Sequence, residues 1–81
     1  MSQARDVVEV VARALVDEPD AVEVTETEHR GVQVIELFVA PGDLGRVIGR
    51  MGRTASALRT LVGVTADYHD FDATLEIREP A

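Results

Sequence analysis

Two glycines, Gly49 and Gly52, stand three residues apart in this 81-residue chain, with arginines at positions 50 and 53. Glycine lacks a Cβ, so the backbone at such a site can turn sharply and approach another backbone closely. A helix that begins at Gly52 would aim free N–H groups and its positive dipole end at the turn, which favours a bound phosphate. Arg50 and Arg53 would add charge there. The spacing therefore predicts a phosphate-binding turn, although the Gly-x-x-Gly pattern alone is weak evidence.

The charge distribution agrees with a local anion site. The formal net charge is −7, which taken alone argues against a nucleic-acid-binding protein. Residues 44–66, however, contain no Asp or Glu and four arginines, Arg46, Arg50, Arg53 and Arg59. They give this stretch +4, which leaves −11 for the remainder of the chain. A basic face on an acidic body can bind phosphate locally while the rest repels it.

The elements before the turn follow from periodicity. Apolar residues recur at helical spacing in residues 3–17, and Pro19 is expected to end that helix near Asp17 or Glu18. Residues 21–29 and 32–39 are rich in β-branched types and predict two strands joined by a tight turn at Gly31. Alternation in the second strand predicts one buried face, formed by Ile35, Leu37 and Val39.

The elements around and after the turn complete one domain, residues 1–81. Residues 43–48 predict a short helix, with Asp43 placed to favour its start and Gly49 ending it. A longer helix is expected from Gly52 to about Ala66, with a buried face that comprises Ala55, Leu58 and Val62. Residues 71–78 predict a last strand, so the fold class is α+β, with the order α-β-β-α-α-β.

Composition and spacing exclude several kinds of site. The chain has no cysteine, so disulfides, thiolate metal sites and a cysteine nucleophile are ruled out. His29 and His69 lack a ligand-spaced partner, and the acidic residues 67–72 lack the pattern of a calcium loop. We expect no metal, no cofactor and no enzymatic activity. No membrane-length apolar run or signal-peptide pattern occurs, so we expect a cytoplasmic location.

The motif Val47-Ile48-Gly49-x-x-Gly52 between two helices resembles the KH domain, whose GXXG loop clamps about four nucleotides. The element order is similar to the type II, prokaryotic arrangement, which implies a three-stranded sheet packed against three helices. Over nearly the whole chain, the sequence resembles the stand-alone bacterial KhpA (YlqC) family. This second resemblance rests mainly on the segments Ala40-Pro41-Gly42-Asp43-Leu44-Gly45, Arg46-Val47-Ile48-Gly49-Arg50 and Gly52-Arg53-Thr54.

The resemblance implies a function in binding single-stranded RNA. It implies an RNA chaperone or post-transcriptional regulator that acts with a KhpB (Jag/EloR)-like KH partner in cell elongation and peptidoglycan homeostasis. Val47 and Ile48 could instead be core residues, and Arg59 a solvated helix face. The alternative function is a KH-fold protein–protein adaptor, favoured by the net charge and by Met51, where KH loops usually carry a basic or polar residue. The implied RNA-binding residues are Arg46, Val47, Ile48, Gly49, Arg50, Met51, Gly52, Arg53 and Arg59.

The helix after the loop carries more apolar residues than one buried face requires. Ala57, Leu61 and Val64 widen its apolar band. If exposed, this band would be a sticky patch that a partner could cover. We therefore expect a dimer through these three residues, either with a second copy or with a KhpB-like KH protein. The alternative is that the band is buried within the monomer.

Overall fold

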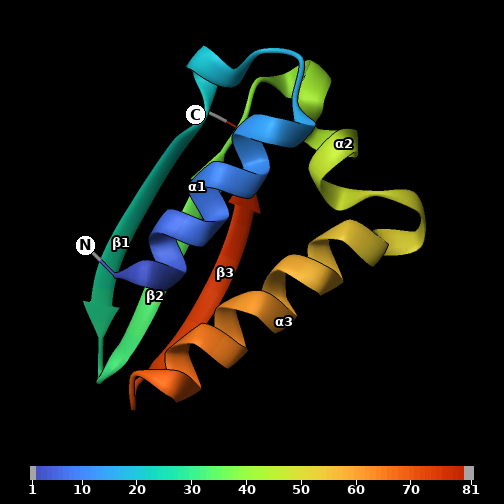
Figure 1. The fold of residues 1–81 in the computed structure, drawn as a ribbon. Coiled ribbons are helices and arrows are strands. Elements are labelled where there is room, and N and C mark those ends of the chain that lie inside the picture. The colour runs from blue at the N-terminus through green and yellow to red at the C-terminus, as the bar shows by residue number, and fades with distance from the viewer. Residues whose placement is uncertain (1, 80–81) are drawn as a thin grey trace.

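The computed structural model describes residues 2–79, so the predicted domain of residues 1–81 extends beyond the described part at both ends. Six main elements follow the predicted order (Figure 1), and three short 3₁₀ turns, at Pro19–Ala21, Pro41–Asp43 and Arg50–Gly52, lie between them. The α+β class and the α-β-β-α-α-β order are confirmed. The main elements are α1 (Gln3–Leu15), β1 (Glu23–His29), β2 (Val32–Phe38), α2 (Leu44–Ile48), α3 (Arg53–Tyr68) and β3 (Asp72–Arg78).

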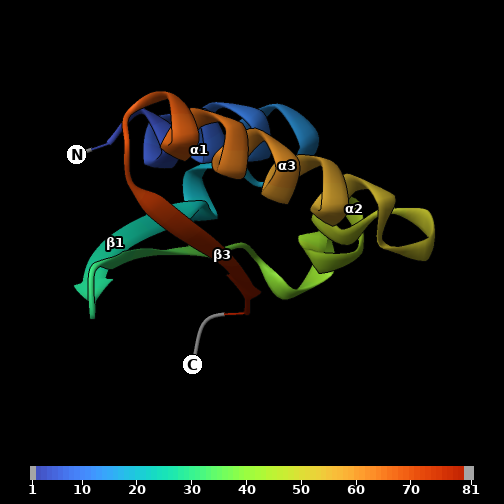
Figure 2. The ribbon, with the colours of Figure 1, turned by 90° about the horizontal axis from the view of Figure 1, so that it is seen from below.

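The three strands form one sheet in the order β1-β2-β3. β1 and β2 pair antiparallel, and β2 and β3 pair parallel. A two-residue turn joins the antiparallel pair, and both of its residues, Arg30 (φ 53) and Gly31 (φ 81), are left-handed, as such hairpins require. The parallel pair needs a long crossover, and α2 and α3 supply it. The three helices lie on one side of the sheet (Figure 2).

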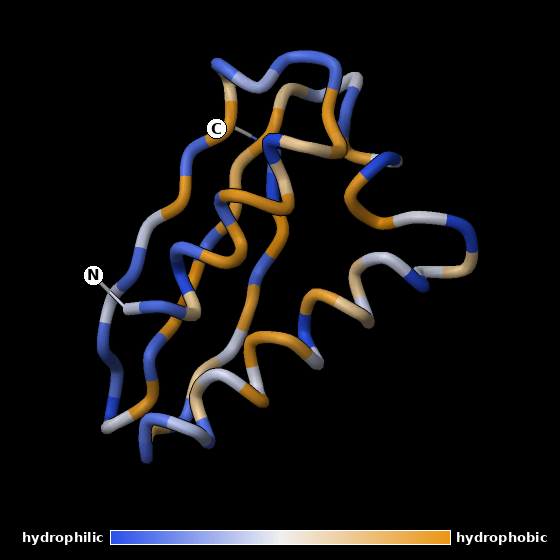
Figure 3. Tube along the Cα trace, viewed as in Figure 1, coloured by the Kyte–Doolittle hydropathy of each residue, from blue (hydrophilic) through white to orange (hydrophobic). Residues whose placement is uncertain are grey.

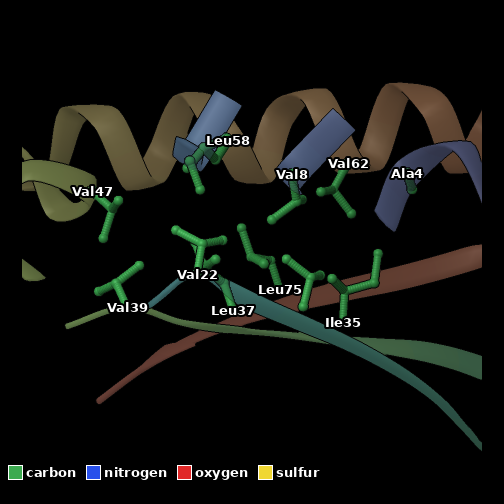
Figure 4. Close-up of a cluster of buried hydrophobic side chains, with 12 residues drawn as sticks. Ala4, Val8, Val22, Ile35, Leu37, Val39, Val47, Leu58, Val62 and Leu75 are labelled. Carbon is green, nitrogen blue, oxygen red and sulfur yellow. The ribbon is translucent and has the colours of Figure 1, made fainter. Parts of the chain in front are cut away.

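The core lies between the helices and the sheet. Apolar and polar residues alternate along the strands, and apolar residues return at about every turn of the helices (Figure 3). The predicted faces, Ile35/Leu37/Val39 of the second strand and Ala55/Leu58/Val62 of α3, are both buried. Figure 4 shows side chains from α1, α2 and α3 meeting those of the sheet. Burial of one apolar face in each element stabilises the domain and fixes where α2 and α3 sit.

Helix α1 ends at Leu15, earlier than the predicted Asp17 or Glu18. Val16 is already extended (φ −93, ψ 160), and the backbone N–H of Asp17 donates to the Asp43 carboxylate at 3.0 Å. Pro19 disfavours helix at the residue before it, and in a continued helix its ring would clash with the carbonyl of Leu15. The end of α1 at Leu15 therefore agrees with the effect of Pro19, and the hydrogen bond from Asp17 to Asp43 holds the chain in its new direction.

Arg5 is a buried cation on α1 that the hydropathy pattern does not reveal. Its Nε and Nη2 atoms donate to the carbonyl oxygen of Val24 in β1, at 3.3 and 3.2 Å. Its Nη1 atom lies 2.7 Å from Glu9 Oε1 and 3.1 Å from Asp6 Oδ1. The hydrogen bond with Arg5 is the main cause that lowers the pKa of Glu9. Paired in this way, Arg5 joins α1 to the edge of the sheet without leaving an unsatisfied buried charge.

Candidate nucleic-acid interface

The turn between α2 and α3 has the glycine-dependent geometry that the sequence predicts. Gly49 ends α2 with φ 76 and ψ 170, and its N–H donates to the carbonyl oxygen of Gly45 at 2.9 Å. A Cβ at Gly49 would lie 2.9 Å from the backbone nitrogen of Thr54 and would clash with the Thr54 side chain. Position 49 therefore requires glycine on two counts, backbone conformation and the close approach of α3.

The second half of the turn is left-handed at two successive residues. Met51 has φ 56 and ψ 25, and Gly52 has φ 73 and ψ 15. The Gly52 N–H donates to the carbonyl oxygen of Gly49 at 3.1 Å, which closes the turn. Gly52 is the N-cap of the 16-residue helix α3, and no side chain within residues 2–79 caps that helix start. The Arg53 N–H, the first of α3, donates to the carbonyl oxygen of Arg50, and no side chain of the described residues caps the N–H groups that follow it. The positive dipole end of α3 faces the loop.

Three of the four predicted arginines carry their charge at the exposed surface of the loop and of α3. Arg50, Arg53 and Arg59 are exposed, and none of the ion pairs formed within residues 2–79 includes them. Arg59 lies six residues beyond Arg53, about 9 Å further along the helix axis, so the two arginines extend the positive surface away from the turn. This arrangement can accept an anion larger than one phosphate.

Arg46 is placed differently. Its Nη2 atom lies 2.9 Å from Asp17 Oδ2, and its Nε atom lies 3.5 Å from Asp43 Oδ1. Residues 44–66 contain no Asp or Glu, but the fold brings Asp17, in the connection that follows α1, next to Arg46. Two carboxylates therefore offset the positive charge of Arg46.

The two apolar residues before the loop separate into a core residue and a surface residue. Val47 is fully buried and points from α2 toward Val39 (Figure 4). Ile48 is only partly buried. For Val47, the core alternative is correct, because a side chain with no exposed surface cannot contact RNA in this conformation. Ile48 keeps surface next to the loop.

Asp43 does not cap α2, contrary to the prediction from its position. No side chain caps that short helix in the described part of the chain. The Asp43 carboxylate, only 2% exposed as a residue, instead accepts from the backbone N–H groups of Asp17 and Glu18, both at 3.0 Å. Asp43 therefore joins the α1–β1 connection to the start of α2. Local spacing could not reveal this, because the partners lie 25 and 26 positions away.

The apolar band of α3 is exposed. Leu61 is 45% exposed and Val64 61% exposed, and Ala57 is also exposed. The alternative, that the monomer buries this band, is therefore wrong. The band adjoins a groove between α1 and α3 that is lined by Gln3, Asp6, Val7, Val10, Val11 and Thr65.

Within residues 2–79, no three His, Asp or Glu side chains group as metal ligands. Asp67, Asp70 and Asp72 line a shallow pocket with Gly31 and Phe71. No helix of this described segment has the length and apolar content needed to cross a membrane.

A two-glycine turn between the helices of a β-α-α-β unit, preceded by an α-β pair on the same sheet, defines a KH domain of the type II arrangement. The chain belongs to the KhpA/KhpB KH-domain family, whose family model matches residues 5–77. This membership supports a binding domain and not an enzyme.

Named relatives cover most of the chain. The RNA-binding protein KhpA of Aquifex aeolicus is 53% identical over 79 residues, which is 98% of this chain and 100% of the relative. KhpA of Caldanaerobacter subterraneus subsp. tengcongensis is 54% identical over 61 residues, which cover 75% of this chain and 81% of the relative. KhpA of Mycobacterium tuberculosis is 48% identical over 73 residues, which cover 83% of this chain and 91% of the relative.

Solved structures of Era share the fold. Aquifex aeolicus Era bound to GDP.AlF4− matches with a TM-score of 0.62, and Era in complex with MgGDPNP and a segment of 16S ribosomal RNA matches with 0.65. Each is 19% identical and covers 94% of this chain, while this chain spans 29% of the Era chain. At this identity the likeness concerns the fold alone.

Proposed function

We propose that this domain binds single-stranded RNA through the loop Gly49–Gly52. One observation carries the proposal: the left-handed turn at Met51 and Gly52 brings the uncapped start of α3 to the same exposed surface as Arg50 and Arg53. Helix N–H groups and guanidinium groups are two kinds of donor that proteins offer to phosphate. The relatives named RNA-binding protein KhpA support RNA as the nucleic acid.

The RNA strand is proposed to continue from the loop along one face of α3. Each of the residues Arg53, Ser56, Arg59, Thr60 and Gly63 lies three or four positions from another member of the set, so they share a side of the helix. The first four are exposed. The small residues leave room for a ribose–phosphate chain, and Arg59 supplies a further cation. A KH loop clamps about four nucleotides, which fits an interface of this size.

The adaptor function remains the second candidate, and the charge arrangement favours it. The net charge is −7, Arg46 is paired with carboxylates, and the second central loop position is Met51. A titration of fluorescent RNA separates the two candidates. We expect the single strand to bind at least several-fold more tightly than a duplex of the same sequence, because a KH loop reads unpaired strands. No measurable binding to either form would favour the adaptor.

We further propose that the exposed band Ala57, Leu61 and Val64 pairs with a second copy of the chain or with a KhpB-like KH protein. A surface of apolar side chains on a small domain is stabilised when a partner covers it. Pairing would bring two GXXG loops onto one particle and raise RNA avidity.

The cellular role follows the family resemblance. We propose an RNA chaperone or post-transcriptional regulator in the cytoplasm that acts in cell elongation and peptidoglycan homeostasis. Deletion of the gene, followed by complementation with a loop variant and by cell-length measurement, tests this role. Full complementation by a variant that cannot bind RNA would contradict it.

A further inference from the structure

Met51 is a sulfur-bearing side chain at the tip of the proposed RNA clamp. It is 84% exposed, and it lies between the two glycines of the loop, next to Arg50. The full sequence has two methionines and no cysteine. The other methionine, Met1, lies outside the described residues. Met51 therefore holds the only sulfur atom within residues 2–79.

The backbone holds the Met51 side chain in this exposed position. Its φ of 56 is left-handed, a conformation that is unfavourable for a residue with a Cβ. The Gly52 N–H bond to the carbonyl oxygen of Gly49 and the close contact of Gly49 with Thr54 maintain the turn around it. The side chain extends from the surface where Arg50 and Arg53 would meet phosphates. A flexible, polarizable thioether at such a place can pack against a ribose or base.

We propose that Met51 is an oxidation-sensitive RNA contact, at which conversion to the sulfoxide by hydrogen peroxide weakens RNA binding. This inference rests on the proposed RNA-binding function of the loop. In the reaction, the sulfur attacks one peroxide oxygen, an S–O bond forms and the O–O bond breaks. Sulfur is oxidised by two electrons and the peroxide is reduced. The departing hydroxide takes the proton of the sulfur-bound hydroxyl and leaves as water, which gives the sulfoxide. Methionine sulfoxide reductases reverse the change.

The sulfoxide should weaken binding for two reasons. The oxidised group is polar, so removing it from water against a ribose or base is unfavourable unless a donor meets it. Its oxygen is also a hydrogen-bond acceptor, as are the phosphate oxygens that the clamp attracts, so these atoms cannot bond to one another. Loss of part of one apolar contact corresponds to about fivefold weaker binding.

The test compares the reduced and peroxide-treated protein by fluorescence anisotropy. The probe is labelled oligouridine of about 12 nucleotides, three times the length that a KH loop clamps. Mass spectrometry follows oxygen addition at Met51 and at Met1 separately, and circular dichroism checks the fold. Met51→Leu keeps an apolar side chain without sulfur, and Met51→Gln mimics the polar sulfoxide.

We expect the affinity of the wild type to fall about fivefold as Met51 is oxidised and to recover after reductase treatment. Met51→Leu should show the same affinity before and after peroxide treatment, and Met51→Gln should bind like the oxidised wild type. Unchanged affinity of folded, Met51-oxidised protein would overturn the inference and leave the clamp intact. An equal loss in peroxide-treated Met51→Leu would also overturn it. Reduced wild type that fails to bind would overturn the RNA clamp itself.

Discussion

The Nη2 atom of Arg46 lies 2.9 Å from Asp17 Oδ2, across 29 positions of the sequence. Both side chains are more than half exposed, so the pair is weak in energy, but it offsets the charge of a cation close to the proposed RNA-binding loop. Asp17→Asn should remove one of the two carboxylates beside Arg46, leaving Asp43 at 3.5 Å, and strengthen RNA binding by up to about twofold. The slope of log K against log salt should steepen by up to about 0.7 if Arg46 then meets a phosphate.

The control for this change is Asp20→Asn. Asp20 is an exposed acid in the same α1–β1 connection, and none of the ion pairs within residues 2–79 includes it. The two variants have equal net charge, so a difference between them reports the Arg46 pair alone. Equal affinity and equal salt slopes for Asp17→Asn and Asp20→Asn would show that the pair does not limit RNA binding.

Asp43 should contribute to the stability of the domain. Asp43→Ala removes the acceptor of the Asp17 and Glu18 backbone N–H groups. Leaving such donors poorly satisfied should lower the free energy of unfolding by roughly 1–3 kcal/mol, measured by urea denaturation. Asp20→Ala serves as the matched control and should stay within about 0.5 kcal/mol of the wild type. Equal midpoints for the two variants would mean that water replaces the carboxylate without loss.

The pair of Glu9 with Arg5 should make stability depend on pH. The hydrogen bond with Arg5 holds the pKa of Glu9 below its ordinary value of 4.5. A lowered folded-state pKa stabilises the native state above the unfolded-state pKa, and this stabilisation is lost as pH falls through the folded-state pKa. The wild type should therefore exceed Glu9→Gln in urea midpoint at pH 7, and the gap should narrow below about pH 4.5. A gap that stays constant from pH 7 to 3 would contradict this linkage.

Leu61 tests the proposed dimer. Leu61→Asp places a charge at the middle of the exposed band and should leave the fold intact, since the side chain is 45% exposed. Light scattering should show a dimer for the wild type and a monomer for the variant. Ser56→Asp, at an exposed position of α3 that is not three or four residues from any member of the band, should remain dimeric. A folded Leu61→Asp protein with the same mass as the wild type would rule out pairing through this band.

Periodicity predicted the elements and the loop because each depends on neighbouring residues. The 3.6-residue spacing of Ala55, Leu58 and Val62 defines the buried face of α3, and the two glycines define the turn. The roles of Arg5, Asp43 and Arg46 depend on partners from 19 to 29 positions away. Asp43 is at an N-cap position, but its carboxylate accepts tertiary hydrogen bonds from Asp17 and Glu18 instead of capping α2. Sequence spacing contains no information on such contacts.

The most direct test of the RNA clamp is an anisotropy titration of single-stranded RNA with Arg50→Asp/Met51→Asp. Both positions are exposed, so the double variant should fold like the wild type by circular dichroism. The matched control, Thr27→Asp/Arg30→Asp, changes the net charge by the same amount on the exposed β1–β2 hairpin, away from the loop. We predict at least about tenfold weaker binding for the loop variant and a loss of less than about threefold for the hairpin control. Equal affinity of the folded loop variant and the wild type would contradict the account.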